Sequence, residues 1–211
     1  MKILHLSDTH GLHHRLDDMP EADVIVHSGD ISNSGTEEEV LDFLNWFIGL
    51  PYPHKIFVTG NHDLCLWEAE GIEDLPGNIH FLQDNGVEIG GVKFFGIAYN
   101  HSEAMIPADT DIVVTHEPPV MILDQSSGIH WGNTPLRNRI FEVSPKYHLF
   151  GHAHQDYGTV EQEGIIFSNA ALLDDMNRLV RMPRLRPLFP SIRRSRKSLH
   201  SCLVMSGLLW C

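Results

Sequence analysis

Five short, strand-like apolar segments of this chain each stop where Asp, Asn or His residues begin. The segments span residues 2–7, 23–28, 55–59, 111–115 and 147–150, and they are followed by Asp8-Thr9-His10, Gly29-Asp30, Gly60-Asn61-His62-Asp63, His116 and Gly151-His152-Ala153-His154. Ligands of α/β sheets bind beyond the carboxyl ends of the strands, so five such ends can converge on one site. Carboxylate, amide and imidazole groups bind divalent metals. The sequence therefore predicts a metal centre.

Length and composition favour one catalytic domain. The chain has 211 residues, of which 42% are hydrophobic, enough for one domain with a real core. No apolar stretch approaches the ~20 residues that span a membrane, and the first residues lack the pattern of a secretory signal. The three cysteines, Cys65, Cys202 and Cys211, are scattered, which favours a reducing compartment. We expect a cytoplasmic protein without a membrane partner.

The charges divide the chain into an acidic part and a basic part. Residues 1–175 contain all 28 acidic residues and only seven basic ones, a net charge of −21, whereas residues 176–211 contain eight basic residues and no acidic one. A groove for nucleic acid normally needs clustered Lys and Arg, so a nucleic-acid partner is not expected for the acidic part. Some of its carboxylates have an obvious use as metal ligands.

Local signals predict a mixed α/β structure. Thr36 and Glu39 form a capping box at the start of a helix with apolar residues at helical spacing, which lies between two strands and implies a right-handed βαβ unit. A second helix is expected around residues 134–141. Gly90-Gly91 predicts a tight hairpin, and a closing hairpin is expected with Gln162-Glu163 between its strands. The sheets should therefore mix parallel and antiparallel strands.

The order of the five motifs resembles that of the calcineurin-like metallophosphoesterases, from Ile3 to about Asp174. Further segments, such as Thr115-His116-Glu117-Pro118-Pro119 and Tyr157-Gly158, look like the small metallophosphoesterase domain-containing group. The resemblance implies a four-layer αββα sandwich with two mixed β-sheets, covering residues 1–186. Residues 187–211 are expected to be a disordered basic tail or a segment foreign to the family, and a basic arm for nucleic acid or acidic lipid remains the alternative.

The resemblance also implies a ligand set for two divalent metal ions. It assigns Asp8, His10 and His154 to the first ion, Asn61, His116 and His152 to the second, and Asp30 to a bridging position. Mixed oxygen and imidazole ligands suit Mn, Fe, Zn or Ni better than calcium, and we expect Mn²⁺. Two such ions ~3.5–4 Å apart activate a bridging water and stabilise an in-line displacement.

The implied reaction is phosphoester hydrolysis by a metal-bridging hydroxide. His62 would stabilise or protonate the leaving alkoxide, and Asp63 would orient the His62 imidazole through its second nitrogen. No cap domain interrupts the motifs, so the expected substrate is a small phosphodiester or phosphomonoester, with cyclic nucleotides among the candidates.

Two further residues are candidates for substrate contacts. His13 follows the first motif closely, and Trp131 precedes the second helix, where it could stack on a base. An exposed loop histidine and a packing anchor are the competing interpretations. At the level of function, the alternatives are a nuclease of the same fold and an interaction protein that has lost catalysis.

Overall fold

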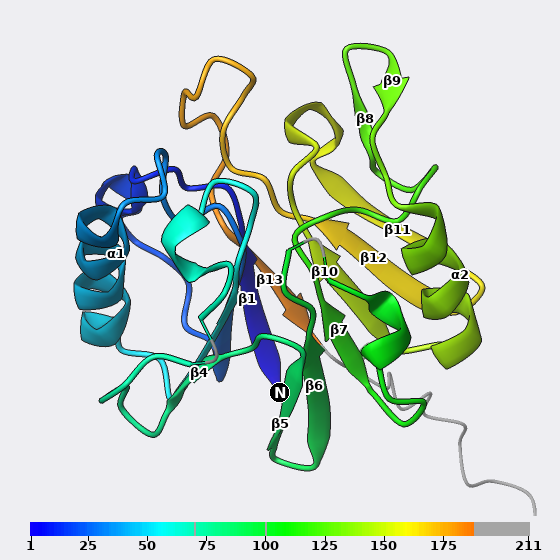
Figure 1. Ribbon diagram of the computed structural model, residues 1–211, viewed down its shortest axis with the longest axis horizontal. Coiled ribbons are helices and arrows are strands. Elements are labelled where there is room, and N and C mark those ends of the chain that lie inside the picture. The colour runs from blue at the N-terminus through cyan, green and yellow to red at the C-terminus, as the bar shows by residue number, and fades with distance from the viewer. Residues whose placement is uncertain (70, 100, 188–211) are drawn as a thin grey trace, which may run out of the picture.

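The protein is described by a computed structural model, which covers residues 1–69, 71–99 and 101–187. Its strands form two larger sheets and a small hairpin (Figure 1). The first sheet has the order β13-β1-β2-β3-β4, with β1 at Lys2–Leu6, β2 at Val24–Ser28, β3 at His54–Val58, β4 at Ile79–Phe81 and β13 at Arg184–Pro187. The second has the order β11-β12-β10-β7-β6-β5, with β5 at Asn85–Ile89, β6 at Val92–Gly96, β7 at Ile112–Val114, β10 at Tyr147–Phe150, β11 at Gly158–Gln162 and β12 at Ile165–Asn169. The hairpin pairs β8 (Gln125–Ser126) with β9 (Ile129–His130).

In the described part of the chain, two α-helices flank the sheets, α1 at Glu37–Gly49 and α2 at Thr134–Val143. The short 3-10 helices are η1 at His13–Arg15, η2 at Leu64–Leu66, η3 at Glu103–Met105 and η4 at His154–Asp156. The predicted capping box starts α1: the Glu39 amide donates to Thr36 Oγ1 over 3.3 Å, and the Thr36 amide donates to Glu39 Oε2 over 3.2 Å. Asn133 caps α2 through the Leu136 amide, at 2.8 Å. Both predicted helices are confirmed.

The helices and sheets form four layers. One apolar core lies between α1 and the first sheet, with Phe43 and Phe47 of the helix packed against Phe57 of β3. A second core lies between the two sheets, and a third lies between α2 and the second sheet. Figure 1 shows α1 and α2 on opposite sides of the molecule with both sheets between them. The predicted αββα sandwich is confirmed.

Both sheets are mixed, as expected. Strands β1, β2, β3 and β4 run parallel to one another, and so do β6, β7, β10 and β12, whereas β13, β5 and β11 add antiparallel edges. The hairpin β5–β6 turns at Gly90-Gly91 as predicted. The hairpin β11–β12 turns one residue later than predicted, at Glu163-Gly164, because Gly164 adopts the left-handed φ of +80° that the turn requires.

The predicted boundary at residue 186 falls inside β13, whose last residue, Pro187, pairs with Lys2. The rest of the predicted tail, residues 188–211, lies outside the described residues. Among the residues that the structure does describe, no helix combines the length and the apolar character needed to cross a membrane.

Candidate metal centre

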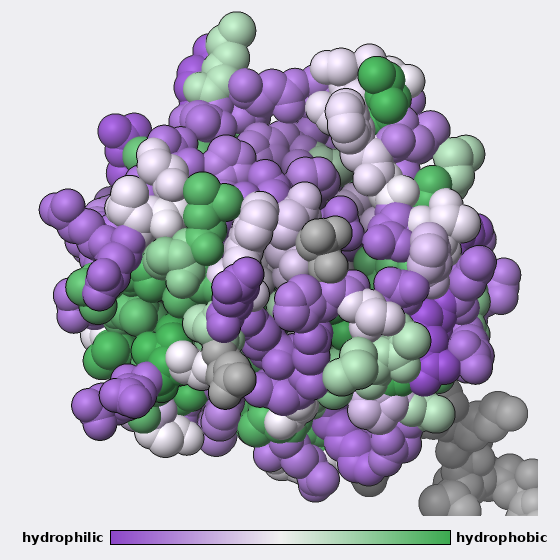
Figure 2. Space-filling view, viewed as in Figure 1, coloured by the Kyte–Doolittle hydropathy of each residue, from purple (hydrophilic) through white to green (hydrophobic). Residues whose placement is uncertain are grey.

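All seven predicted ligands follow directly from the carboxyl ends of β1, β2, β3, β7 and β10. Three of these strands belong to the first sheet and two to the second, so the ligands approach from both sheets. The expected convergence therefore occurs, but at the shared edge of two facing sheets rather than in one open sheet. Hydrophilic side chains cover the upper centre of the face in Figure 2, the side to which these strand ends point in Figure 1.

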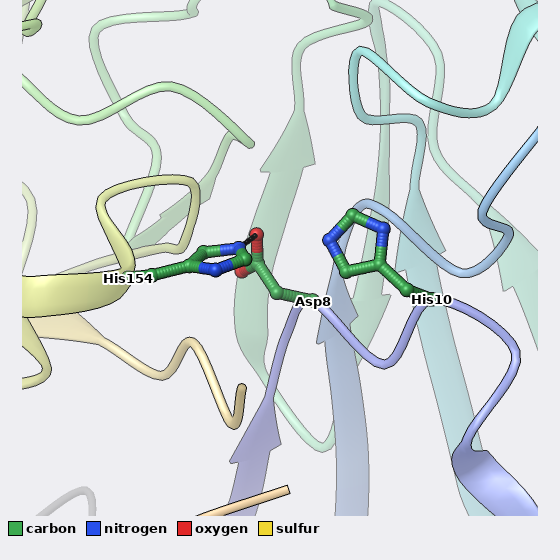
Figure 3. Close-up of side chains that lie close together, drawn as sticks. All are labelled: Asp8, His10 and His154. Atoms are coloured by element: carbon green, nitrogen blue, oxygen red, sulfur yellow. Dashed lines mark hydrogen bonds and ion pairs between the residues drawn. The ribbon is translucent and has the colours of Figure 1, made fainter. Parts of the chain in front are cut away.

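The first ligand group joins the end of β1 to the loop after β10. His154 Nε2 lies 3.1 Å from Asp8 Oδ1, and the rings of His10 and His154 have centroids 5.5 Å apart. Figure 3 shows the imidazoles of His10 and His154 on either side of the Asp8 carboxylate. One ligand atom of each residue falls within 4.8 Å of those of the other two, which is close enough for a shared ion.

Asp30 lies between this group and the next. Its Oδ2 atom is 3.5 Å from His10 Nε2 and 3.4 Å from His116 Nε2. Its Oδ1 atom accepts the backbone N–H of His62 over 2.8 Å, which fixes the carboxylate. One carboxylate oxygen thus faces an imidazole from each of the two predicted ligand groups.

The second group combines an amide oxygen with two imidazoles. Asn61 Oδ1 lies 2.9 Å from His116 Nε2 and 2.9 Å from His152 Nδ1, and the two imidazole centroids are 5.1 Å apart. Asn61 comes from the first sheet, whereas both histidines follow strands of the second. The seven residues of the implied ligand set therefore lie together.

The backbone of this centre is strained. Asp8, His10, Asp30 and His152 have φ angles of +56°, +41°, +56° and +67°, in the left-handed region that non-glycine residues seldom adopt. Such conformations persist only where the surrounding structure imposes them, and they concentrate at functional sites. Four of the seven predicted ligands share this feature, so holding them in place lowers the stability of the folded state.

Two glycines let the strand-end loops approach the carboxylates. A Cβ atom at Gly60 would lie 2.2 Å from Asp30 Oδ1, and one at Gly151 would lie 2.1 Å from Asp8 Oδ2. Neither contact is possible for a real side chain, so only glycine allows these carboxylates their observed positions. The glycines of two motifs thus form a cradle around the ligand oxygens.

Two buried carboxylates give the centre its negative charge. Burial would raise the pKa of the Asp8 carboxyl, but the hydrogen bond with His154 and the neighbouring imidazoles hold that pKa well below its usual range. Burial would raise the pKa of Asp30 as well, but its interactions with His116 and His10 together lower it. Burial likewise opposes charge on His116, yet Asp30 raises the pKa of this imidazole to about 10. Both carboxylates are therefore ionised at neutral pH and favour a cation between them.

Two of the histidines, His10 and His152, fit a metal in protonation, and His116 fits one in orientation. Both ring nitrogens of His10 are buried and have no hydrogen-bond partner among the described residues, a costly state that a bound cation would relieve. Burial lowers the pKa of His10 and brings that of His152 to about 4, so both rings are neutral at pH 7 and offer a lone pair. His116 Nδ1 donates to the carbonyl of Ser28 over 2.9 Å, which turns Nε2 toward the centre. These residues fit divalent metal ions.

The expected partner of His62 is corrected. Its Nδ1 atom donates to the backbone carbonyl of Asn33 over 2.7 Å, whereas the Asp63 carboxylate accepts its hydrogen bonds from other groups. The imidazole stands edge-on to His10, with centroids 4.7 Å apart, so His62 does lie beside the ligands. Sequence reasoning missed Asn33 because its contribution is a backbone carbonyl, which leaves no trace in residue type.

Asp63 instead ties two strand-end loops together. Its carboxylate accepts the backbone N–H groups of Asp30, Ser32 and Gly60 over 2.9, 3.0 and 2.8 Å, and the Ser32 hydroxyl over 2.7 Å. Burial and the nearby Asp30 raise its pKa, while these hydrogen bonds oppose the rise. The difference from the prediction arises because Asp63 is fully buried, whereas its neighbour His62 faces the partly open side of the centre.

Of the two candidate substrate contacts, Trp131 lies next to the predicted metal ligands and His13 does not. Trp131 lines a cavity of about 450 Å³ together with the predicted ligands Asn61 and His152, so it lies next to the centre. His13 does not line this cavity: it is fully buried against α1, where its ring meets that of Trp46 at a centroid distance of 5.0 Å. Tyr99 lines the same cavity and was missed, because no motif marks the polar loop that contains it.

Comparisons with known proteins agree with this geometry. A family model described as calcineurin-like phosphoesterase matches residues 1–156. UPF0046 protein K07C11.7 of Caenorhabditis elegans is 33% identical in an alignment 214 residues long, which covers 87% of this chain and 73% of that protein. Human Metallophosphoesterase domain-containing protein 1 is 29% identical, covering 79% of this chain and 64% of that protein.

A solved crystal structure with 14% sequence identity matches 89% of this chain and 99% of its own, with a TM-score of 0.60. At this identity, the likeness supports the fold alone. The family model covers well over half of the sequence and includes all five of the predicted metal motifs. The chain belongs to the calcineurin-like phosphoesterase family.

Proposed function

We propose that this protein is a binuclear metal-dependent phosphoesterase that hydrolyses a small phosphodiester or phosphomonoester. The observation that carries the proposal is the position of Asp30 Oδ2, which lies 3.5 Å from His10 Nε2 and 3.4 Å from His116 Nε2. A carboxylate between two groups of metal donors is the arrangement that a bridging ligand needs. Asp8 and His154 would complete the first set of ligands.

Asn61 and His152 would complete the second set around His116. When bound, two divalent ions would lower the pKa of a water between them and stabilise the charge on the attacking and leaving oxygens. The mixture of oxygen and imidazole donors suits Mn, Fe, Zn or Ni, and Mn²⁺ is the first ion to test.

His62 is the proposed general acid. Its Nδ1 atom is held by the Asn33 carbonyl, so a protonated His62 ring carries its second proton on Nε2, free to move to a leaving oxygen. The ring stands beside His10 at the centre, within reach of an ester bound there. Asp63 supports this step indirectly, by fixing the loop that carries His62.

The cavity beside the second ligand group would hold the organic part of the ester. It offers the rings of Tyr99 and Trp131 and the carboxylate of Glu117 next to Asn61 and His152. A flat ring system could stack on these aromatic side chains. Cyclic nucleotides are therefore the first substrates to test within the class of small phosphoesters.

The test combines metal analysis with hydrolysis. Protein loaded with Mn²⁺ is assayed against bis-p-nitrophenyl phosphate, p-nitrophenyl phosphate and 2′,3′- and 3′,5′-cyclic nucleotides, and its ions per chain are counted. We expect two ions and measurable turnover, and His152→Ala should lose an ion and most of its turnover. Silence across the panel would refute the enzymatic proposal and favour an interaction protein of the same fold.

The general acid is tested by a matched pair of variants. His62→Asn should lower kcat by about 10²–10⁴-fold while both ions stay bound. The control is His54→Asn, because His54 begins β3 at the end opposite to the metal motif. Equal turnover in the two variants would remove His62 from the mechanism.

A further inference from the structure

Two imidazoles and a carboxylate gather on the outer side of the first sheet, where η1 packs against α1. We propose that His13, His14 and Asp42 form a separate binding site for a zinc-class transition-metal ion. One ligand atom from each of the three residues falls within 4.8 Å of the others. The group shares no residue with the ligands at the strand ends, so this inference does not depend on the proposed function.

The distance from each imidazole to the carboxylate matches that between two ligands of one ion. His13 Nε2 lies 3.2 Å from Asp42 Oδ2, and His14 Nε2 lies 3.2 Å from both carboxylate oxygens. Tetrahedral ligands at about 2.0–2.1 Å from zinc lie about 3.3–3.4 Å apart, so little movement is needed to admit an ion. Each imidazole is therefore already close to ligand spacing from the carboxylate.

The His13 ring supplies an independent indication of a ligand. It is fully buried, yet among the described residues neither ring nitrogen has a hydrogen-bond partner, and Nε2 only approaches Asp42 Oδ2 at 3.2 Å. Contacts with the rings of Phe43 and Trp46, at centroid distances of 5.6 and 5.0 Å, hold the imidazole in this direction. A buried imidazole without hydrogen bonds is costly, and a metal bound at Nε2 would relieve that cost.

The donors select the class of ion. Two imidazoles and one carboxylate suit Zn²⁺, Ni²⁺ or Cu²⁺, whereas Ca²⁺ and Mg²⁺ prefer oxygen ligands. Burial lowers the pKa of His13 to about 4, so the ring is neutral and able to bind metal at pH 7. The side chains of His14 and Asp42 are 56% and 55% exposed, which leaves room for water as a further ligand.

An ion at this site would join two elements. His13 and His14 belong to η1, which follows the His10 loop, and Asp42 lies on α1. Without the ion, this junction depends on the packing of His13 and on hydrogen bonds between the exposed His14 and Asp42. The bound ion would therefore stabilise the loop that carries His10 without itself taking part in the strand-end centre.

The test counts zinc ions in the full chain. Wild type, His14→Ala and Asp42→Asn are stripped with EDTA, dialysed against a buffered concentration of free zinc, and analysed for metal per chain. Both substituted side chains are exposed, so the variants should fold, which circular dichroism checks. The matched control is His101→Ala, because His101 also pairs an exposed imidazole with a carboxylate, its Nδ1 lying 2.5 Å from Asp84, but belongs to no such group of three ligands among the described residues.

We expect each of the two site variants to carry one zinc ion per chain fewer than wild type, and His101→Ala to match wild type. Zinc should also raise the thermal midpoint less in the two variants than in wild type. Equal zinc content in wild type and both site variants would overturn the proposal, and so would an equal loss in His101→Ala. The comparison is repeated in proteins that also carry Asp30→Asn, a substitution in the strand-end centre. The substitutions at His14 and Asp42 should still remove one zinc ion per chain in that background, which separates this site from the strand-end centre.

Discussion

Replacing Gly60 by alanine tests whether the close approach of two loops positions the central carboxylate. The added Cβ would lie 2.2 Å from Asp30 Oδ1 and 2.4 Å from the Asp30 amide nitrogen. Real Cβ atoms essentially never approach other atoms below 3.0 Å, so the carboxylate or the loop must shift by about 0.8 Å, the difference between 3.0 and 2.2 Å. Gly60 has no positive φ, so this substitution acts through space alone.

The loops cannot separate freely. The amides of Gly60 and Asp30 both donate to Asp63 Oδ2, over 2.8 and 2.9 Å, so moving them apart weakens buried hydrogen bonds to a carboxylate. We expect Gly60→Ala to lower the free energy of unfolding by about 1–3 kcal/mol, which is typical of overpacking. A shift of this size at a predicted metal ligand should also lower kcat by about 10²-fold.

Urea unfolding, metal content and hydrolysis of bis-p-nitrophenyl phosphate measure these effects. The control is Gly49→Ala at the end of α1, where an added Cβ meets nothing within 4 Å. This variant should keep wild-type metal content and turnover. Wild-type stability and turnover in Gly60→Ala would refute the argument that the glycine cradle positions Asp30.

Three further outcomes follow from the same contacts. Asp63→Asn should lower the free energy of unfolding in urea by at least about 2 kcal/mol, because it removes a charged acceptor of buried N–H groups. A loss of stability no larger than that of the surface variant Asp23→Asn would contradict this. Burial lowers the pKa of His148 to about 3. The neutral ring therefore makes its full contribution to the free energy of unfolding above pH 6.5, and this contribution falls on the order of 1 kcal/mol per pH unit toward pH 3. In urea unfolding, the free energy of unfolding of His148→Phe should fall less steeply with acid than that of wild type. EDTA should lower the thermal midpoint of wild type more than that of His154→Ala, whose metal group has already lost a donor, and equal shifts would count against His154 as a ligand.

The local signals in the sequence were sufficient for many of the secondary-structure elements and for the residues that gather at the strand ends. The capping box at Thr36 and Glu39 contains its own hydrogen-bond partners, so it specifies the start of α1 without help from distant residues. The strand-end motifs work in the same way, because parallel strands in a layer bring their carboxyl ends to one edge. Asp8 and His10 therefore reach the centre as predicted.

The direction of individual side chains was less accessible. Adjacent residues such as His62 and Asp63 face different surroundings, and the choice of partner depended on where the Asp30 loop packs. His13 was a candidate for a substrate contact or an exposed loop histidine, but α1 covers it, and the exposed histidine is its neighbour His14. These outcomes depend on contacts that no local pattern records.

By itself, the sequence determined which side chains follow the strand ends and that their chemistry suits metal, because both depend on residue type and short-range spacing. Only the tertiary structure decided how they are combined. Asn61 meets His116 and His152 across 55 and 91 residues of chain, and these contacts exist because one core packs the two sheets face to face. Close packing between distant segments, which periodicity does not encode, made one centre from five separate motifs.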